Sequence, residues 1–208
     1  AGDQLTLCVC FFAQGLLLVE PFTRLLEALG PVGLCGKKGR FHLESIDEDS
    51  GQSTARELWS GGDFSITPTI LDLSQRFDVS IGTSVKFEFM TPARLLKNSR
   101  PLFRSGFGEI FPFVLRRVTG MLATWAELED VFDTSYLLEC AATLVESENR
   151  LHWQDWRPLQ KHEEAGGLSG SINLRGNELE ELWPLLVIGE LFGIGKGAAF
   201  GAGRYRLI

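Results

Sequence analysis

A glycine-rich segment near the carboxyl end holds the residues whose types and spacing suggest a binding site. Residues 193–205 read Gly-Ile-Gly-Lys-Gly-Ala-Ala-Phe-Gly-Ala-Gly-Arg-Tyr, so five glycines occupy thirteen positions. Glycine adopts positive φ and lets a ligand approach the backbone, and successive N–H groups can cradle a phosphate. The segment therefore predicts a site for a polyanion backbone, with positive charge but no acid in residues 193–206. The predicted contacts are Gly193, Gly195, Lys196, Gly197, Gly201, Gly203, Arg204 and Arg206.

The spacing of these glycines matches neither common nucleotide motif. A P-loop requires glycine where Glu190 stands and serine or threonine where Gly197 stands. A dinucleotide-binding fingerprint runs from strand to helix, whereas this segment is expected to run from helix to strand. The structural alternative is that the glycines only form a tight crossover between the two elements.

The elements that must position this segment follow from hydrophobic periodicity. Alternation predicts strands at 85–89, 151–156, 168–174 and 203–207, and helical spacing predicts helices at 110–122 and 185–192. Their order is β-α-β-β-α-β, which is typical of a ferredoxin-like fold. We therefore expect an α+β domain in which the glycine-rich segment joins the last helix to the last strand.

The first third of the chain predicts part of a second copy of this unit. A buried strand is expected at Leu5–Phe12, a helix from Pro21 to Leu29, a glycine-rich turn, and a strand at Arg40–Glu44. Gly39-Arg-Phe-His-Leu43 resembles Gly203-Arg-Tyr-Arg-Leu207 at the equivalent point. We expect residues 1–63 to hold a partial ferredoxin-like unit, which lacks its leading β-α-β, and a linker at 46–63. Residues 64–208 are expected to form a complete domain.

Composition indicates a protein that can build a core. The 208 residues are 44% hydrophobic and 23% charged, which excludes disorder, collagen and a disulfide-stapled miniprotein. The net charge of −7 argues against a protein that coats DNA with its whole surface. Residues 127–148 carry seven acids and no base, so a solvated face or an acidic insertion is expected.

The apolar run Leu5–Val19 is too short to span a bilayer, so no membrane contact and a cytoplasmic location are expected.

Four segments together resemble one known family. The carboxyl-terminal segment 193–205 is similar to the signature of the CRISPR repeat-processing endoribonucleases of the RAMP superfamily. Phe87-Glu-Phe-Met-Thr-Pro-Ala-Arg94, Leu115-Arg-Arg117 and Gly166-Gly-Leu-Ser-Gly170 occur in the family's order, so the resemblance covers about residues 80–208. It implies tandem ferredoxin-like domains and metal-free cutting of precursor CRISPR RNA, with the glycine-rich loop beside the RNA. It also places the catalytic histidine in the amino-terminal domain, in a region that the repeat comparison finds missing here.

A second basic stretch could extend an RNA interface. Between residues 94 and 117, only Glu109 opposes six basic residues, and Phe103 and Phe107 are interleaved with them. Basic residues with aromatics suit phosphate contact and base stacking on single-stranded RNA. Arg94 and Lys97 are predicted RNA contacts, and a solvated loop is the alternative. For Arg116 and Arg117, ordinary charges on a helix surface are favoured.

Histidine is the natural candidate for metal-free RNA cleavage, because a base must activate a 2′-hydroxyl and an acid must protonate the leaving oxygen. The chain offers His42, His152 and His162. For each, an ordinary exposed or packed histidine is favoured, so the catalytic residue stays unassigned, with His42 and His162 as weak candidates. No histidine has the cysteine or histidine neighbours of a metal site, no Cys-x-x-Cys pair occurs, and no metal or cofactor is expected.

These observations lead to three functional hypotheses. In the first, the chain binds CRISPR repeat RNA, and the full-length protein cleaves that RNA without a metal. In the second, it is a non-catalytic RAMP subunit that scaffolds CRISPR RNA beside other CRISPR-associated subunits. In the third, it is a ferredoxin-like domain for protein contacts.

Overall fold

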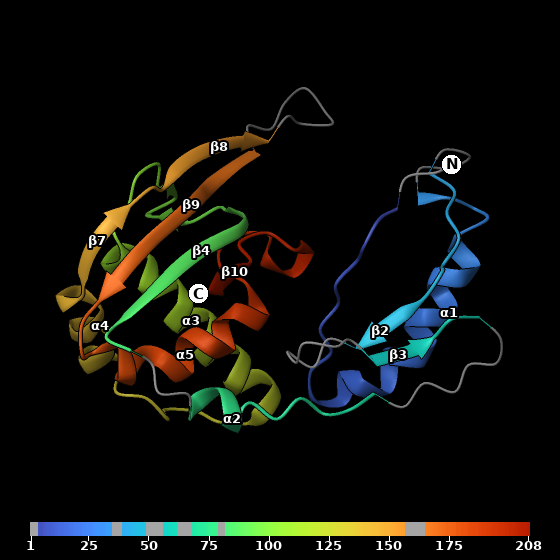
Figure 1. Cartoon of the computed structure of the whole chain (residues 1–208), viewed down its shortest axis with the longest axis horizontal. Helices are drawn as coiled ribbons and strands as arrows, with labels where there is room; N and C mark the ends of the chain where they lie inside the picture. Colours follow the sequence, from blue (N-terminus) through green and yellow to red (C-terminus); the bar gives the residue numbers. More distant parts are fainter. Residues whose placement is uncertain (1–3, 35–38, 49–55, 62–67, 79–81, 157–164) are drawn as a thin grey trace. The chain divides into compact units, whose positions relative to one another are not determined.

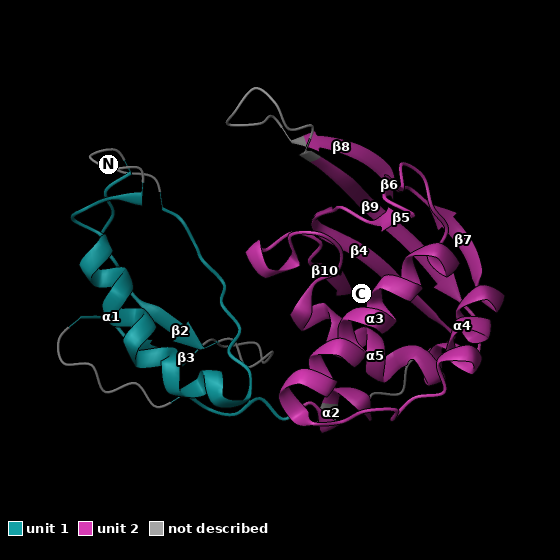
Figure 2. Cartoon of the chain, turned by 180° about the vertical axis from the view of Figure 1, so that it is seen from behind, with its two compact units in different colours: residues 1–72 teal, residues 73–208 magenta. Residues whose placement is uncertain are grey.

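The chain forms two compact units, residues 1–72 (unit 1) and 73–208 (unit 2), which Figure 2 colours separately. The computed structural model describes residues 4–34, 39–48, 56–61, 68–78, 82–156 and 165–208. No helix in these described ranges is both long and apolar enough to cross a membrane.

Unit 2 is built on one antiparallel sheet (Figure 1). The strands are β4 (Ser84–Ala93), β7 (Val145–Asn149), β8 (His152–Trp156), β9 (Ala165–Arg175) and β10 (Tyr205–Leu207). They lie in the order β10-β4-β9-β7, and β8 also pairs with β9. Helices α3 (Phe107–Ala126) and α5 (Leu179–Phe192) follow β4 and β9 in the chain. Because β7 and β8 pair with successive parts of β9, they take the place of one strand. The resulting β-α-β-β-α-β order confirms the ferredoxin-like fold that the sequence predicts.

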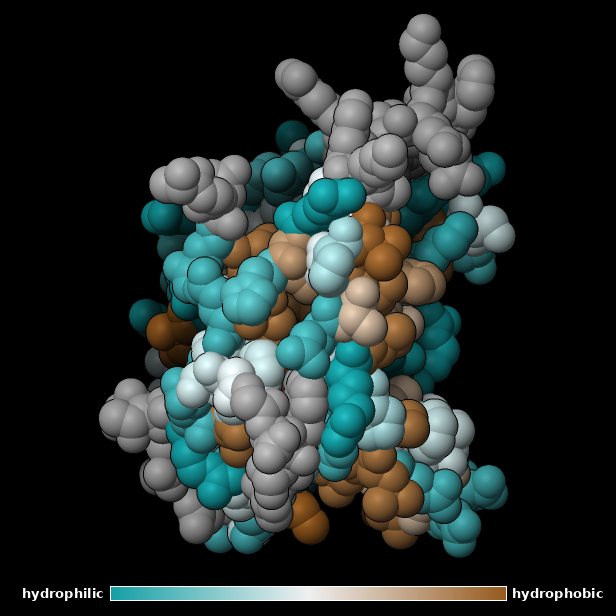
Figure 3. Space-filling view, turned by 90° about the vertical axis from the view of Figure 1, so that its right-hand side faces the viewer, coloured by the Kyte–Doolittle hydropathy of each residue, from teal (hydrophilic) through white to brown (hydrophobic). Residues whose placement is uncertain are grey.

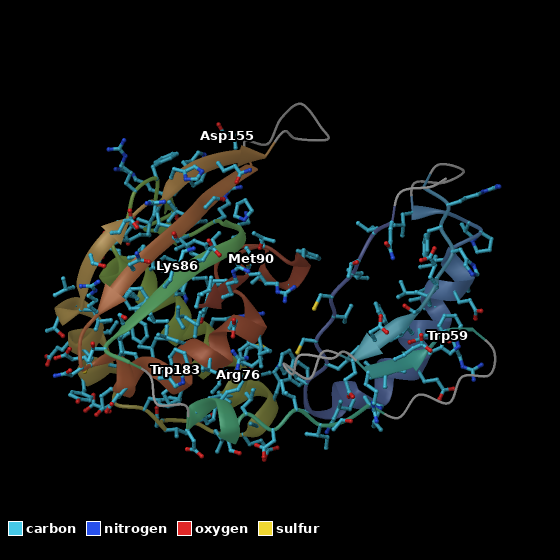
Figure 4. All side chains as sticks on the ribbon, in the orientation of Figure 1. Trp59, Arg76, Lys86, Met90, Asp155 and Trp183 are labelled. Carbon is cyan, nitrogen blue, oxygen red and sulfur yellow. The ribbon has the colours of Figure 1, made fainter. Side chains whose placement is uncertain are left out.

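Alternation along β4 determines which face of the sheet is buried. Val85, Phe87 and Phe89 point into the core, while Lys86 and Glu88 lie on the other, partly exposed face. Figure 4 shows Lys86 in the middle of that open face. The buried face is covered by the helices, whose apolar residues recur every three or four positions. These are Ile110, Phe111, Val114 and Val118 of α3 and Leu179, Leu182, Leu185 and Leu186 of α5.

Shorter elements complete unit 2. They are α2 (Ser74–Phe77), the hairpin of β5 (Leu96–Lys97) and β6 (Arg100–Pro101), α4 (Thr134–Thr143) and the 3-10 turn η2 (Ala198–Phe200). Within the acidic stretch, α4 packs Leu137 and Cys140 into the core. Its Asp133 side chain caps the helix by accepting from the Tyr136 backbone N–H at 3.0 Å. All seven acids of residues 127–148 are exposed, and one of them, Glu139, lies within α4, so the acidic stretch is solvated.

Unit 1 contains η1 (Ala13–Leu18), α1 (Val19–Leu29) and a hairpin of β2 (Ile46–Glu48) and β3 (Arg56–Trp59). Helix α1 confirms the expected helix, and it ends at Gly30. The expected linker at 46–63 is wrong in part, because β2 and β3 pair with each other there.

Two strands expected in unit 1 are wrong. Leu5–Phe12 has no regular structure, and Leu5 and Leu7 are 85% and 63% exposed. Arg40–Glu44 is also irregular. A strand needs a hydrogen-bonding neighbour, and the two described strands of unit 1 pair only with each other. Figure 3 shows one face of the chain, on which apolar groups in brown lie among polar groups in teal.

Candidate nucleic-acid interface

The glycine-rich segment is a structured loop that joins α5 to β10. Helix α5 stops where Gly193 takes a φ of +61°, and the Gly193 N–H still bonds the Gly189 carbonyl at 3.0 Å. The loop closes on itself through the Ile194 N–H, which donates to the Gly203 carbonyl at 2.9 Å. All five loop glycines have positive φ, at Gly193, Gly195, Gly197, Gly201 and Gly203.

The loop is fixed along the end of β4. The Lys196 N–H donates to the Arg94 carbonyl at 2.8 Å, and the Gly203 N–H donates to the Pro92 carbonyl at 3.0 Å. Thr91 holds the loop with one hydroxyl. Its Oγ1 donates to the Gly201 carbonyl at 2.7 Å and accepts from the Arg204 N–H at 2.9 Å. The loop is therefore hydrogen-bonded to the segment Thr91–Arg94.

Close backbone approach explains why glycine is needed here. A Cβ on Gly195 would lie 2.6 Å from the Arg94 carbonyl oxygen, so any larger residue would push the loop away from β4. From the other side of the strand, a Cβ on Gly167 of β9 would lie 2.7 Å from the Ala93 backbone. The three sequence segments that resemble the family (87–94, 166–170 and 193–205) therefore meet at Ala93–Arg94.

Positive side chains gather around this loop. Lys196 and Arg204 are exposed on the loop, and Arg94 is half-buried beneath it. Arg116 and Arg117 of α3 line a depression of about 250 Å³ together with Gly195 of the loop. The other lining residues are Phe113, Gly120 and Met121, so no acid lies among the residues that line this depression in the described part of the chain. The arrangement can hold an anion against the loop backbone.

Two arginines near the loop, Arg94 and Arg117, each have one side-chain donor that makes no hydrogen bond to the described residues. The Nε atoms of Arg94 and Arg117 are buried and have no hydrogen-bond partner among the described residues. Buried donors are normally paired, so these two Nε atoms are among the exceptions in the described part of the chain. Arg116 lies over the Phe113 ring, with its guanidinium carbon 5.0 Å from the ring centre, and this contact holds the side chain at the rim.

Two other predicted RNA contacts, Arg206 and Lys97, form ion pairs with acidic side chains. Arg206 pairs with Glu88, and its Nε donates to Oε2 at 2.7 Å. Lys86 also bonds Glu88, at 2.8 Å, and the hydrogen bonds from Lys86 and Arg206 lower the pKa of that carboxyl. Lys97 lies on the β5–β6 hairpin and reaches Glu109 at 3.3 Å. The charges of Arg206 and Lys97 are therefore partly offset by neighbouring acids.

His152, the described histidine of unit 2, is not among the residues that anchor the loop or line its depression. His42 is exposed in unit 1, where it lines a depression of about 480 Å³ with Glu27 and Arg40. His152 is exposed on β8, and its Nδ1 lies 3.4 Å from the Arg150 carbonyl. His162 lies outside the described residues. In the described ranges, no group of three or more His, Cys, Asp or Glu side chains is arranged to hold a metal ion.

Sequence reasoning missed two features of the site. It favoured an ordinary helix surface for Arg116 and Arg117, whereas the structure places both beside Gly195. It also left Phe200 out of the candidate contacts, although the side chain is 94% exposed on the loop. The available signals were the family-like Leu-Arg-Arg segment and the lone aromatic residue among loop glycines and alanines.

The fold and site together define a ferredoxin-like domain with a basic, glycine-rich loop docked on its first strand. The profile of the family described as CRISPR-associated endoribonuclease Cas6 matches residues 87–205. This is more than half of the chain, so the chain belongs to the Cas6 family. No curated protein sequence matches the chain.

Solved Cas6 structures share this fold. One Cas6 product complex is similar with a TM-score of 0.56 and 17% identity, over 92% of this chain and 72% of that chain. A second product complex gives a TM-score of 0.51 and 15% identity, over 94% and 76%. Thermus thermophilus Cas6 gives a TM-score of 0.45 and 15% identity, over 61% and 53%. A Cas6 substrate mimic complex is matched over 56% of its own length, so the chain spans about half of these last two structures.

Proposed function

We propose that this chain binds CRISPR repeat RNA through the loop 193–204 and the arginines around it. The observation that carries the proposal is the basic depression in which Gly195 meets Arg116 and Arg117, beside exposed Lys196 and Arg204. An RNA backbone is a regular series of negative charges, and such a strand binds where cations line a path that acids do not interrupt. Two solved Cas6 structures are described as product complexes and one as a substrate mimic complex, which supports RNA as the polyanion.

We further propose that the full-length protein cleaves the bound repeat as a metal-independent RAMP endoribonuclease. In that reaction a base removes the proton of a 2′-hydroxyl, the 2′-oxygen attacks the neighbouring phosphorus, and an acid protonates the departing 5′-oxygen. His42 and His162 are the candidates in this chain. In unit 1, His42 stands beside Arg40 and Glu27 around one depression, so a charged partner for the imidazole is available.

Unit 1 is proposed to be a partial copy of the same fold. The Gly33 N–H bonds the Leu29 carbonyl at 2.8 Å, and the Leu34 N–H bonds the Gly39 carbonyl at 3.2 Å. The equivalent bonds in unit 2 run from Gly193 to Gly189 and from Ile194 to Gly203. In both places a glycine with positive φ follows the helix, at Gly33 and Gly193, and the glycine that accepts the second bond precedes an arginine.

One observation favours the second hypothesis, a non-catalytic subunit that scaffolds CRISPR RNA with other CRISPR-associated proteins. Among the described residues that anchor the loop or line its depression, none is a histidine. Scaffolding needs only the binding surface, whereas cleavage needs an acid and a base within reach of one phosphate. The two functions share the same RNA interface and differ in whether the RNA is cut.

The experiment compares binding and cutting of a labelled hairpin-repeat RNA in EDTA. Lys196→Ala with Arg204→Ala should weaken binding about tenfold or more and lower the slope of log K against log salt by about 1.4, since single strands give about 0.7 per phosphate contact. The matched control is Arg150→Ala with Arg175→Ala, which removes the same charge from exposed positions elsewhere on unit 2. Equal effects of the two double variants would refute the site. Cutting by the wild-type chain would favour the nuclease, and binding without cutting would favour the scaffold.

A further inference from the structure

The tip of the glycine-rich loop displays an aromatic side chain that no part of unit 2 covers. Phe200 is 94% exposed, more than any other large hydrophobic side chain in the described residues. Its neighbours Ala198 and Ala199 are small, so the ring stands alone on the loop. A phenylalanine left in water forgoes the free energy that burial would provide, and both faces of its ring are open to a ligand.

The backbone beneath this ring is rigid although the ring itself is free. Phe200 ends the 3-10 turn η2, and its N–H donates to the Gly197 carbonyl at 2.8 Å. The Ala202 N–H donates to the same carbonyl at 3.2 Å, and Thr91 Oγ1 ties Gly201 to β4. The side chain therefore projects from a fixed point, so little backbone entropy is lost when a ligand meets it.

The charges on either side indicate the chemistry of the ligand. Lys196 and Arg204 are exposed four residues before and four residues after Phe200. A nucleic-acid strand that sets its phosphates on these cations passes the ring, and its bases are the only flat apolar groups that it carries. A phenyl ring has no hydrogen-bonding group, so it accepts any base face that is not already paired.

We propose that Phe200 is the stacking platform for one unpaired nucleobase of the RNA on this loop. The proposal rests on the proposed function, because it assigns a base contact to the same binding site. Phosphate contacts from the loop position the strand without regard to sequence, and the ring adds a contact that only a single-stranded nucleotide can make. The loop thus distinguishes unpaired RNA from the stem of a hairpin.

The test uses the full chain and a single-stranded RNA that carries 2-aminopurine, whose fluorescence falls when the base stacks. Phe200→Ala should weaken binding about 5- to 150-fold, which corresponds to the usual loss of one base–aromatic stack. It should also remove the fluorescence quenching at one position of the RNA. Phe200→Trp should retain both properties, because indole offers a larger aromatic face.

Phe200→Leu is the matched control, because it keeps an exposed apolar side chain and removes the aromatic face. We expect it to behave like Phe200→Ala. Wild-type affinity for either variant would overturn the proposal, and wild-type affinity for Phe200→Leu alone would identify an apolar contact instead of a stack. If the wild-type chain binds RNA and Lys196→Ala with Arg204→Ala weakens binding while Phe200→Ala does not, stacking fails and the proposed function stands. If the wild-type chain shows no salt-sensitive binding, both fail.

Discussion

Gly203 is the position where a single methyl group should disrupt the loop most. Its φ is +66°, it is buried, and a Cβ built on it would overlap the carbonyl oxygen of Ile194. Its two backbone groups bond Ile194 on one side and Pro92 on the other, at 2.9 and 3.0 Å. Relief of the overlap requires the loop to separate from β4, so Gly203→Ala should cost both strain and hydrogen bonds.

The loss of unfolding free energy in Gly203→Ala has two parts, backbone strain and broken hydrogen bonds. Comparison with Gly201→Ala separates them. Gly201 has a φ of +86°, is exposed, and has nothing within 4 Å of a built Cβ. It therefore reports only the cost of a left-handed alanine, about 1–2 kcal/mol. Gly203→Ala adds the loss of about two backbone hydrogen bonds, each worth about 1 kcal/mol. We expect about 3–4 kcal/mol for Gly203→Ala, a large share of the stability of a small domain.

Urea unfolding followed by tryptophan fluorescence measures both variants. Four of the five tryptophans lie in unit 2, at positions 125, 153, 156 and 183, so the signal reports mainly on that unit. RNA binding is measured in parallel on the folded fraction. If the two variants lose the same free energy of unfolding within about 0.5 kcal/mol, the argument from close backbone approach is refuted.

Three further predictions concern single contacts. Thr91→Val removes the hydroxyl that holds the loop, so RNA binding should weaken severalfold while the urea midpoint changes little; an unchanged affinity would show that the loop orders itself. Glu146 accepts from the Phe107 N–H at 2.6 Å at the start of α3, so Glu146→Ala should cost about 1 kcal/mol in urea unfolding, and no loss would contradict this capping role. The Tyr205 hydroxyl donates to the Leu186 carbonyl at 2.7 Å, so Tyr205→Phe should cost about 1 kcal/mol near neutral pH. Burial raises the pKa of Tyr205 well above its ordinary value, so its neutral form stabilises the fold below about pH 10 and that stability is lost as pH rises further; Tyr205→Phe should flatten this alkaline decline, and an unchanged decline would argue against it.

The fold of unit 2 was predictable because local pattern and tertiary environment agree there. Val85, Phe87 and Phe89 alternate along a strand that has paired neighbours on both sides, so the pattern finds the sheet that it needs. The helices at 107–126 and 179–192 carry continuous apolar stripes and bury them on that sheet. In unit 1 the run Leu5–Phe12 has an equally apolar composition, but no described strand pairs with it. Periodicity shows which face of a segment would be buried, but it does not show whether a neighbouring strand is present to pair with that segment.

The candidate site likewise combines features that the local sequence predicts with features that depend on tertiary contacts. Five glycines and the cations Lys196 and Arg204 could be chosen from the sequence, because glycine types and charge spacing within one loop are local properties. The neutralisation of Arg206 by Glu88 could not, since the two residues are 118 positions apart and meet only across β10 and β4. The same holds for Arg116 and Arg117, which reach the loop because α3 packs beside it.

The sequence by itself determined the order of the main strands and helices in unit 2, the position of a glycine-rich loop before the last strand, and the positive charge of that loop. These follow from side-chain type and short-range periodicity, which act within a few residues. Only the tertiary structure decided that Thr91 to Arg94 seat the loop, that α3 supplies its arginines, and that Phe200 remains uncovered. Each of these depends on backbone approach and burial between segments far apart in the chain, which no local pattern encodes.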